Sequence, residues 1–489
     1  MIRRSVDTVT SSSAVVVGDP PVVGPRFRRP VTVLAALIVV LFVALVGGFL
    51  ASRSRLEHLS NPESSLALVV GRTLDVRFVV EHQGSWERRV SELLLDDRTN
   101  ELAQAIGWYA ELAALVRDPA VDLQLAILEG EAGRRPRLRE KLDAWEVRPD
   151  PYPIMAAVIN TAYLGRSEDL SSDAIARLPA EGHPWFGEQL ALRLALRFGD
   201  QARAEEILAV RAERTTPLRR RVRTLAALEV GVLAAAVVGV GSVLLRRQRL
   251  RLASAPLPPP WSGQVGAIVL VRGAALQVLL LTALWALSQA ADSAVLNALT
   301  WPWSNLFFLP MLLLARHHLI RPAGLRLRDA LGLSLDHGAG RRLVTIVAML
   351  VGFGLMGDWV SGLIATRVGV MSHWTEWFDE DLVWGGGGDA ALSIISAVIA
   401  APFFEEVVFR GLLFATFRRR FGLLFSALAS ALIFAVAHGY GWVGLASVLW
   451  SGVLWAWSYE QTRSVVPGML AHALVNLLAS LSLLLLLRT

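Results

Sequence analysis

The sequence contains no cysteine among its 489 residues. This absence excludes a thiol nucleophile, a zinc site with cysteine ligands and any disulfide bond. Lysine is nearly absent as well, because Lys141 is the only one and the remaining positive charge is arginine. Any chemistry must therefore come from Glu, Asp, His or Ser side chains.

Long polar stretches are also scarce, since 54% of the residues are hydrophobic and the mean hydropathy is +0.48. A chain this apolar is typical of a protein that crosses the membrane several times. The formal net charge is +6, but the arginines cluster at the ends of apolar segments, where loop charge sets membrane topology. We therefore expect the lipid bilayer as a partner and no nucleic acid.

The N-terminal half predicts an anchored soluble domain. Residues 1–29, rich in Ser, Thr, Val and Pro, carry five arginines and predict a disordered cytoplasmic tail. The apolar run 30–50 is long enough to span a bilayer and has no convincing cleavage site, which indicates an uncleaved signal anchor. Residues 51–223 are charged, with apolar positions at helical spacing, and predict an extracytoplasmic α-helical domain. Its helices fit either a tetratricopeptide-like (TPR-like) array or an irregular bundle.

The C-terminal half predicts a membrane domain. Residues 224–251 form a second span that ends in a basic run, 252–264 form a proline-rich linker, and 265–489 hold the remaining spans. Those spans are expected at 266–288, 301–315, 343–365, 390–414, 422–438, 442–459 and 466–487. The prediction is an all-α polytopic bundle of about nine spans in a bacterial plasma membrane, with the N-terminus cytoplasmic. The acidic, tryptophan-rich stretch 374–389 is then an outer loop, either a lid or a plain flexible loop.

Six polar residues interrupt the last apolar segments. They are Glu405, Glu406, Arg410, His438, His472 and Asn476. Each would cost about 2.5–3.5 kcal/mol or more in lipid unless it faced a partner or a wet cavity, so by default they mark a functional site.

The spacing of these residues assigns their roles. Glu406 and Arg410 stand four apart, as do Phe434 and His438, and such pairs share one face of an α-helix. Glu405 lies about 100° round from Glu406 and is expected to point elsewhere. We therefore predict a structural ion pair between Glu406 and Arg410, a packing role for Phe434, and a chemical role for Glu405.

A carboxylate with two imidazoles suits two mechanisms. In the first, Glu405 and His438 activate a water as general base, while His472 and Asn476 stabilise the oxyanion. In the second, Glu405, His438 and His472 hold a zinc ion whose fourth ligand is the attacking water. Both predict hydrolysis of a peptide bond within the membrane. No His-Glu-x-x-His run is present, so no cofactor is certain and zinc remains open.

Three motifs in order along the last spans carry a resemblance to a known family. Glu405-Glu406-x-x-x-Arg410, Phe434-x-x-x-His438 and His472-x-x-x-Asn476 resemble the motifs of the CAAX prenyl protease and bacteriocin-processing (CPBP, or Abi) family over about residues 325–487. The resemblance implies an intramembrane endopeptidase, often labelled a metalloprotease, whose first Glu and two His form the catalytic centre. It also implies a membrane protein or peptide as substrate.

Two non-protease interpretations stay open on the sequence. One is a non-catalytic membrane scaffold or immunity protein that binds a protein partner through residues 51–223. The other is a transporter, because buried Glu, Arg and His also build proton relays. A transporter should show repeat symmetry between its halves, and the sequence has none that we detect.

Overall fold

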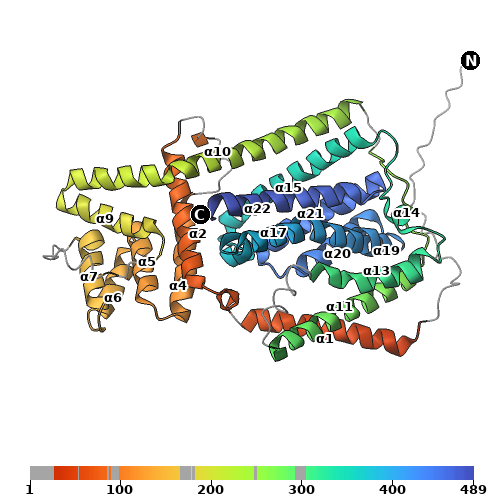
Figure 1. Ribbon diagram of the computed structural model, residues 1–489, viewed down its shortest axis with the longest axis horizontal. Coiled ribbons are helices and arrows are strands. Elements are labelled where there is room, and N and C mark those ends of the chain that lie inside the picture. The colour runs from red at the N-terminus through yellow and green to blue at the C-terminus, as the bar shows by residue number, and fades with distance from the viewer. Residues whose placement is uncertain are drawn as a thin grey trace, which may run out of the picture.

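A computed structural model of the chain describes residues 27–52, 54–84, 88–89, 98–165, 178, 182–246, 250–291 and 304–488. All regular elements in these ranges are helices, which confirms the predicted all-α fold class. Figure 1 shows a helical domain on one side and a larger bundle of long helices on the other. Apart from residues 27–29, the predicted disordered tail lies outside the described residues.

In the described residues the bundle has nine apolar segments, each overlapping one of the predicted spans. They are α1 (Arg29–Ser52), the second half of α10 (Gln201–Arg246), α11 (Gly263–Ala291), the run η3, α13 and η4 (Ser304–Phe308, Leu309–Ala315, Arg316–Ile320), α15 (Gly340–Val368), the run from α17 to α19 described below, α20 (Leu423–Val436), α21 (Trp442–Thr462) and α22 (Val466–Leu486). Within the described part of the chain, six helices are long and apolar enough to cross a membrane, and Asn305–Ile320 and Leu423–Val436 are shorter apolar helices.

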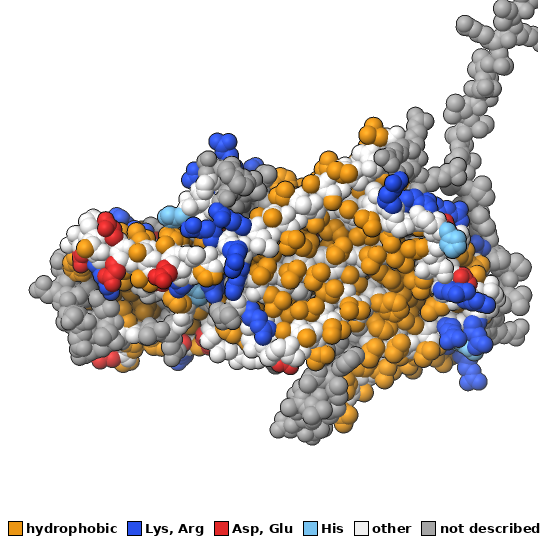
Figure 2. Space-filling model, turned by 45° about the horizontal axis from the view of Figure 1, so that its top comes forward, with side chains coloured by type: hydrophobic (Ala, Val, Ile, Leu, Met, Phe, Trp, Pro, Cys, Tyr) orange, Lys and Arg blue, Asp and Glu red, His pale blue; other side chains and the backbone are white. Residues whose placement is uncertain are grey.

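The outer surface of the bundle is apolar. Figure 2 shows a wide belt of hydrophobic side chains, with Lys and Arg gathered at the end away from the helical domain and in a second group beside that domain. Val40, Leu313 and Leu424 are each more than 60% exposed. A continuous surface of this kind fits lipid rather than water. We call the end of the bundle that carries α14 (Leu327–Leu331) and α19 (Ala415–Arg418) the basic end.

The helical domain packs consecutive helices around its own core. Its elements are η1 (Arg55–His58), α2 (Pro62–Glu81), α4 (Arg98–Leu115), α5 (Pro119–Glu131), α6 (Arg135–Trp145), α7 (Tyr152–Ile159), η2 (Asn160–Leu164), α9 (Pro184–Phe198) and the first half of α10. Asn61 and Asp118 cap α2 and α5 through their side chains, each with proline in the first turn, which is a favourable start for a helix. Fully buried Leu66, Tyr109 and Leu128 belong to its core.

Two expected connections differ from the sequence interpretation. The boundary expected between residues 223 and 224 falls inside α10, which continues without a break and includes Pro217. The expected linker 252–264 is packed against the bundle, because Leu252 is fully buried and its N–H donates to the Thr462 carbonyl at 2.9 Å. Domain and bundle are therefore joined by one long helix, and the proline-rich segment lies across the turn between α21 and α22.

The tryptophan-rich stretch is folded against the helical domain. It forms η5 (Trp374–Glu376), α16 (Glu380–Val383) and the start of α17, and Trp374 is fully buried in the hydrophobic core of the helical domain. The Ser60 N–H donates to Glu380 at 2.9 Å. We call residues 374–386 the docked loop, since these contacts join it to the helical domain.

Candidate active site

The segment that carries Glu405 changes its helical pitch several times. It runs through α17 (Gly387–Ile395), a π-helical turn η6 (Ser396–Ala400), α18 (Ala401–Glu405), a longer π-helix η7 (Glu406–Phe414) and α19. Pro402, at the start of α18, cannot donate the usual helix hydrogen bond and its ring crowds the preceding turn. Because π-helical turns are rare and frequently occur at functional sites, this segment is the natural place to look for chemistry.

The structure contains the ion pair between Glu406 and Arg410. Arg410 Nη1 donates to Glu406 Oε1 at 2.8 Å, and both side chains are 1% exposed. The guanidinium carbon of Arg410 lies 4.3 Å from the ring centroid of Phe434 on α20 and 4.9 Å from that of Trp455 on α21. One arginine therefore connects three elements of the bundle.

His472 on α22 lies between the two adjacent carboxylates. Its Nδ1 is 3.4 Å from Glu406 Oε1 and its Nε2 is 3.8 Å from Glu405 Oε2, while its ring stacks on Trp455 at 4.3 Å between centroids. Glu405 and Glu406 thus point to different nitrogens of the ring, and both carboxylates meet at one histidine. The chain passes from α18 into the wider π-helix at this pair, and α22 places its imidazole between the two side chains.

Like Glu406, Glu405 has a carboxylate oxygen, Oε2, that accepts no hydrogen bond from the described residues. Its side chain is 17% exposed, and Oε2 has no hydrogen-bond partner among the residues that the structure describes. The neighbouring Glu406 is bonded to Arg410, so the two carboxylates differ in environment. The difference lies in the bond to Arg410, which only Glu406 makes.

His438 lies just beyond the end of α20. Its Nδ1 is 2.8 Å from the Phe434 carbonyl, and because a carbonyl only accepts, Nδ1 carries the proton and Nε2 keeps its lone pair when the ring is neutral. Phe434 packs edge-on against both imidazoles, with centroid separations of 4.6 Å to His438 and 6.1 Å to His472. The two histidines therefore flank one aromatic ring.

Tyr440 joins this group and has no counterpart in the sequence analysis. Its ring centroid is 5.5 Å from that of His438. Burial raises the pKa of Tyr440, and the negative charges of Glu405 and Glu376 raise it further. The tyrosine thus lies within electrostatic reach of the Glu405 carboxylate, a proximity that depends on the turn between α20 and α21 and that no spacing rule would predict.

Asn476 contacts the backbone of the Glu405 segment. Its Nδ2 donates to the Ala397 carbonyl in η6 at 2.7 Å. The sequence predicts this amide as an oxyanion donor, and the structure uses one of its two N–H groups to tie α22 to the segment that carries Glu405.

The residues expected to bind zinc do not form a ligand set. No group of three His, Asp or Glu side chains in the described ranges is arranged to hold a metal ion. His472 has a carboxylate near each ring nitrogen and Trp455 against its face. As placed, Glu405, His438 and His472 do not fit a zinc ion.

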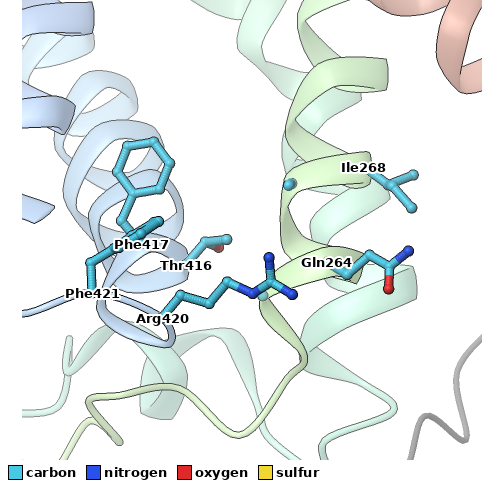
Figure 3. A pocket seen from close by; sticks show the side chains of 8 residues that line it. Gln264, Ile268, Thr416, Phe417, Arg420 and Phe421 are labelled. Carbon is cyan, nitrogen blue, oxygen red and sulfur yellow. The ribbon is translucent and has the colours of Figure 1, made fainter. Parts of the chain in front are cut away.

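A separate cavity of about 500 Å³ lies at the basic end. Figure 3 shows it between α11 and the end of the α19 segment, and its labelled lining residues are Gln264, Ile268, Thr416, Phe417, Arg420 and Phe421. It includes none of the residues discussed above. The cavity therefore belongs to another part of the bundle.

A comparison with known families matches one part of the chain. Residues 387–478 match the family described as Rce1-like, type II CAAX prenyl endopeptidase Rce1-like. This range contains all of the polar residues predicted for the site and excludes the helical domain. No curated protein and no solved structure matches the chain.

Proposed function

Since the chain belongs through residues 387–478 to the CAAX-type membrane endopeptidases of the CPBP family, we propose that it hydrolyses a peptide bond of a membrane-associated protein or peptide within the bilayer. The observation that carries this proposal is the Glu405 carboxylate. It lies in an apolar bundle, beside His472, with an oxygen that no described residue donates to. Such an oxygen is suited to take a proton from water.

In the proposed reaction Glu405 and His438 act together as the general base. Glu405 supplies the free carboxylate oxygen and His438 the unprotonated Nε2. The water oxygen attacks the carbonyl carbon of the scissile peptide bond as its proton moves to this base. The same proton then passes to the amine that leaves, which restores the base.

The oxyanion that forms during the attack needs a donor. We assign this donor to His472, whose ring nitrogens lie 3.4 Å from Glu406 and 3.8 Å from Glu405, since a preorganised donor stabilises the developing charge. Asn476 uses one N–H to hold the Glu405 segment and has a second N–H for the oxyanion.

We also propose an orientation for the chain. With the basic end in the cytoplasm, the arginines of that end obey the positive-inside rule. The helical domain then lies outside a bacterial plasma membrane and the N-terminus lies inside.

Comparative proteomics of membrane fractions tests the proposal. The comparison uses cells that carry the wild type, Glu405→Gln or a control, Glu229→Gln. Glu229 is a carboxylate of α10 that lies outside the family match. We expect an uncleaved precursor to accumulate only with Glu405→Gln. Identical profiles for all three would contradict a protease. A partner of the helical domain that is lost on deletion of the domain, without any effect of Glu405→Gln, would favour the scaffold interpretation.

A further inference from the structure

One buried carboxylate of the docked loop contacts the start of α21. The Glu376 side chain is 8% exposed, and its Oε1 accepts a hydrogen bond from the Gly441 N–H at 3.0 Å. The same oxygen accepts from the guanidinium of Arg55, which lies in η1 between the first span and the helical domain. One side chain therefore links the docked loop, the exit of α1 and the start of α21.

The contact with Gly441 acts as a helix cap supplied by another segment. Gly441 is the N-cap residue of α21 and has no side chain to satisfy the free N–H groups of the first turn. A carboxylate at a helix N-terminus is also favoured by the helix dipole. The Glu376 carboxylate thus accepts from the N–H of the N-cap residue, the bond that a Glu at N3 makes in a capping box.

Glycine at two positions of α21 makes room for this carboxylate. A Cβ atom on Gly441 would lie 2.8 Å from Glu376 Oε1, and one on Gly444 would lie 3.0 Å from Glu376 Oε2. Both separations are shorter than an ordinary van der Waals contact. The start of α21 is therefore shaped to take the Glu376 side chain.

The capped turn is also the turn that carries His438. Residues 437–441 connect α20 to α21, and they include His438 and Tyr440. Glu376 and Glu405 both act on Tyr440 through their charges, which places this tyrosine within reach of the cap and of the proposed base. Holding Gly441 in place therefore limits the movement of His438, three residues away.

We propose that Glu376 is a positioning residue, which caps α21 from the docked loop and thereby fixes His438 for catalysis. The helical domain, which buries Trp374 of the same loop, is then part of the frame of the active site as well as a surface for partners. The catalytic part of this inference rests on the proposed function, whereas the capping part does not.

Hydrogen exchange of the purified full-length protein tests the cap directly. The variants are Glu376→Ala, Glu376→Gln and the control Glu380→Ala, whose side chain binds Ser60 of the helical domain from the same loop. In Glu376→Ala, exchange in a peptide covering residues 437–444 should become roughly five- to tenfold faster, as expected for a lost cap. Glu376→Gln keeps an acceptor oxygen and should restore most of the protection. Equal exchange in Glu376→Ala and wild type, or an equal increase in Glu380→Ala, would overturn the cap.

Turnover of the precursor that accumulates with Glu405→Gln tests the consequence for catalysis. We expect Glu376→Ala to lower kcat roughly five- to tenfold with little change in KM, and Glu376→Gln to recover most of the rate. A rise in KM alone, or an unchanged kcat, would refute the positioning role. If the chain cleaves nothing, the proposed function fails by itself, and the exchange experiment still decides whether Glu376 caps α21.

Discussion

Replacement of Arg410 by alanine should destabilise the whole bundle. The change strands the Glu406 carboxylate, which is 1% exposed and accepts a hydrogen bond from Arg410. Breaking a buried ion pair from one side typically costs about 3–5 kcal/mol. Loss of the guanidinium from the rings of Phe434 and Trp455 adds up to about 2 kcal/mol, the value for a desolvated cation–π contact. The stranded charge is the larger of these two contributions. Because total stabilities are about 5–15 kcal/mol, their sum is a large fraction of the free energy of unfolding.

Unfolding in mixed micelles with an increasing fraction of denaturing detergent would measure this loss. Arg410→Ala should unfold at a clearly lower fraction than the wild type, and Arg410→Lys should fall between them because it keeps the charge without the planar stacking. The double variant Glu406→Gln/Arg410→Met removes both charges and should recover much of the stability. If Arg410→Ala were as stable as the wild type and merely inactive, the reasoning would be refuted and the arginine would be a substrate-binding group.

Three further predictions follow from particular residues. The chain has no cysteine, so single introduced cysteines report the topology. Val147→Cys in the helical domain, at an 88% exposed position, should react with an impermeant maleimide in intact cells, whereas His337→Cys should react only after lysis. The reverse pattern would invert the topology. Gly468→Ala would place a Cβ 2.9 Å from Glu406 Oε2 and should cost about 1–3 kcal/mol in the micelle assay, as overpacking does, so wild-type stability would show that α22 can shift freely. Burial, and then the charges of Arg214 and Arg72, lower the pKa of His183 from 6.5 to about 3. Between these values the unfolded chain binds more protons than the folded one, so stability should fall as pH drops from 6.5 towards 3. His183→Asn, which can still cap α9, should flatten this fall in melting curves, and an unchanged slope would contradict the account.

The membrane segments could be predicted from the sequence because lipid leaves few alternatives to a helix of sufficient apolar length. The span expected at 466–487, for example, is α22 (Val466–Leu486). The polar residues of the site could also be predicted, since a charged residue in an apolar segment has a cost that only a partner or a function explains.

What the sequence could not provide depends on contacts between distant segments. The π-helical turns around Glu405 and the bond from Asn476 to the Ala397 carbonyl follow no regular spacing, so no rule based on α-helical pitch predicts them. The docked loop resembles a surface loop in composition. Trp374 is buried in the core of the helical domain. Most residues of that core lie more than 200 positions before Trp374 in the sequence.

Cleavage of the accumulated precursor by purified protein in liposomes tests the central claim most directly. The wild type should cleave it at the site used in cells, and Glu405→Gln should be slower by at least 10²-fold, as expected when a general base is lost, while unfolding at the same detergent fraction. A chelator separates the two mechanisms, since a zinc enzyme would lose its rate and regain it with metal, whereas a Glu/His base would be unaffected. Cleavage by Glu405→Gln at the wild-type rate would contradict the account.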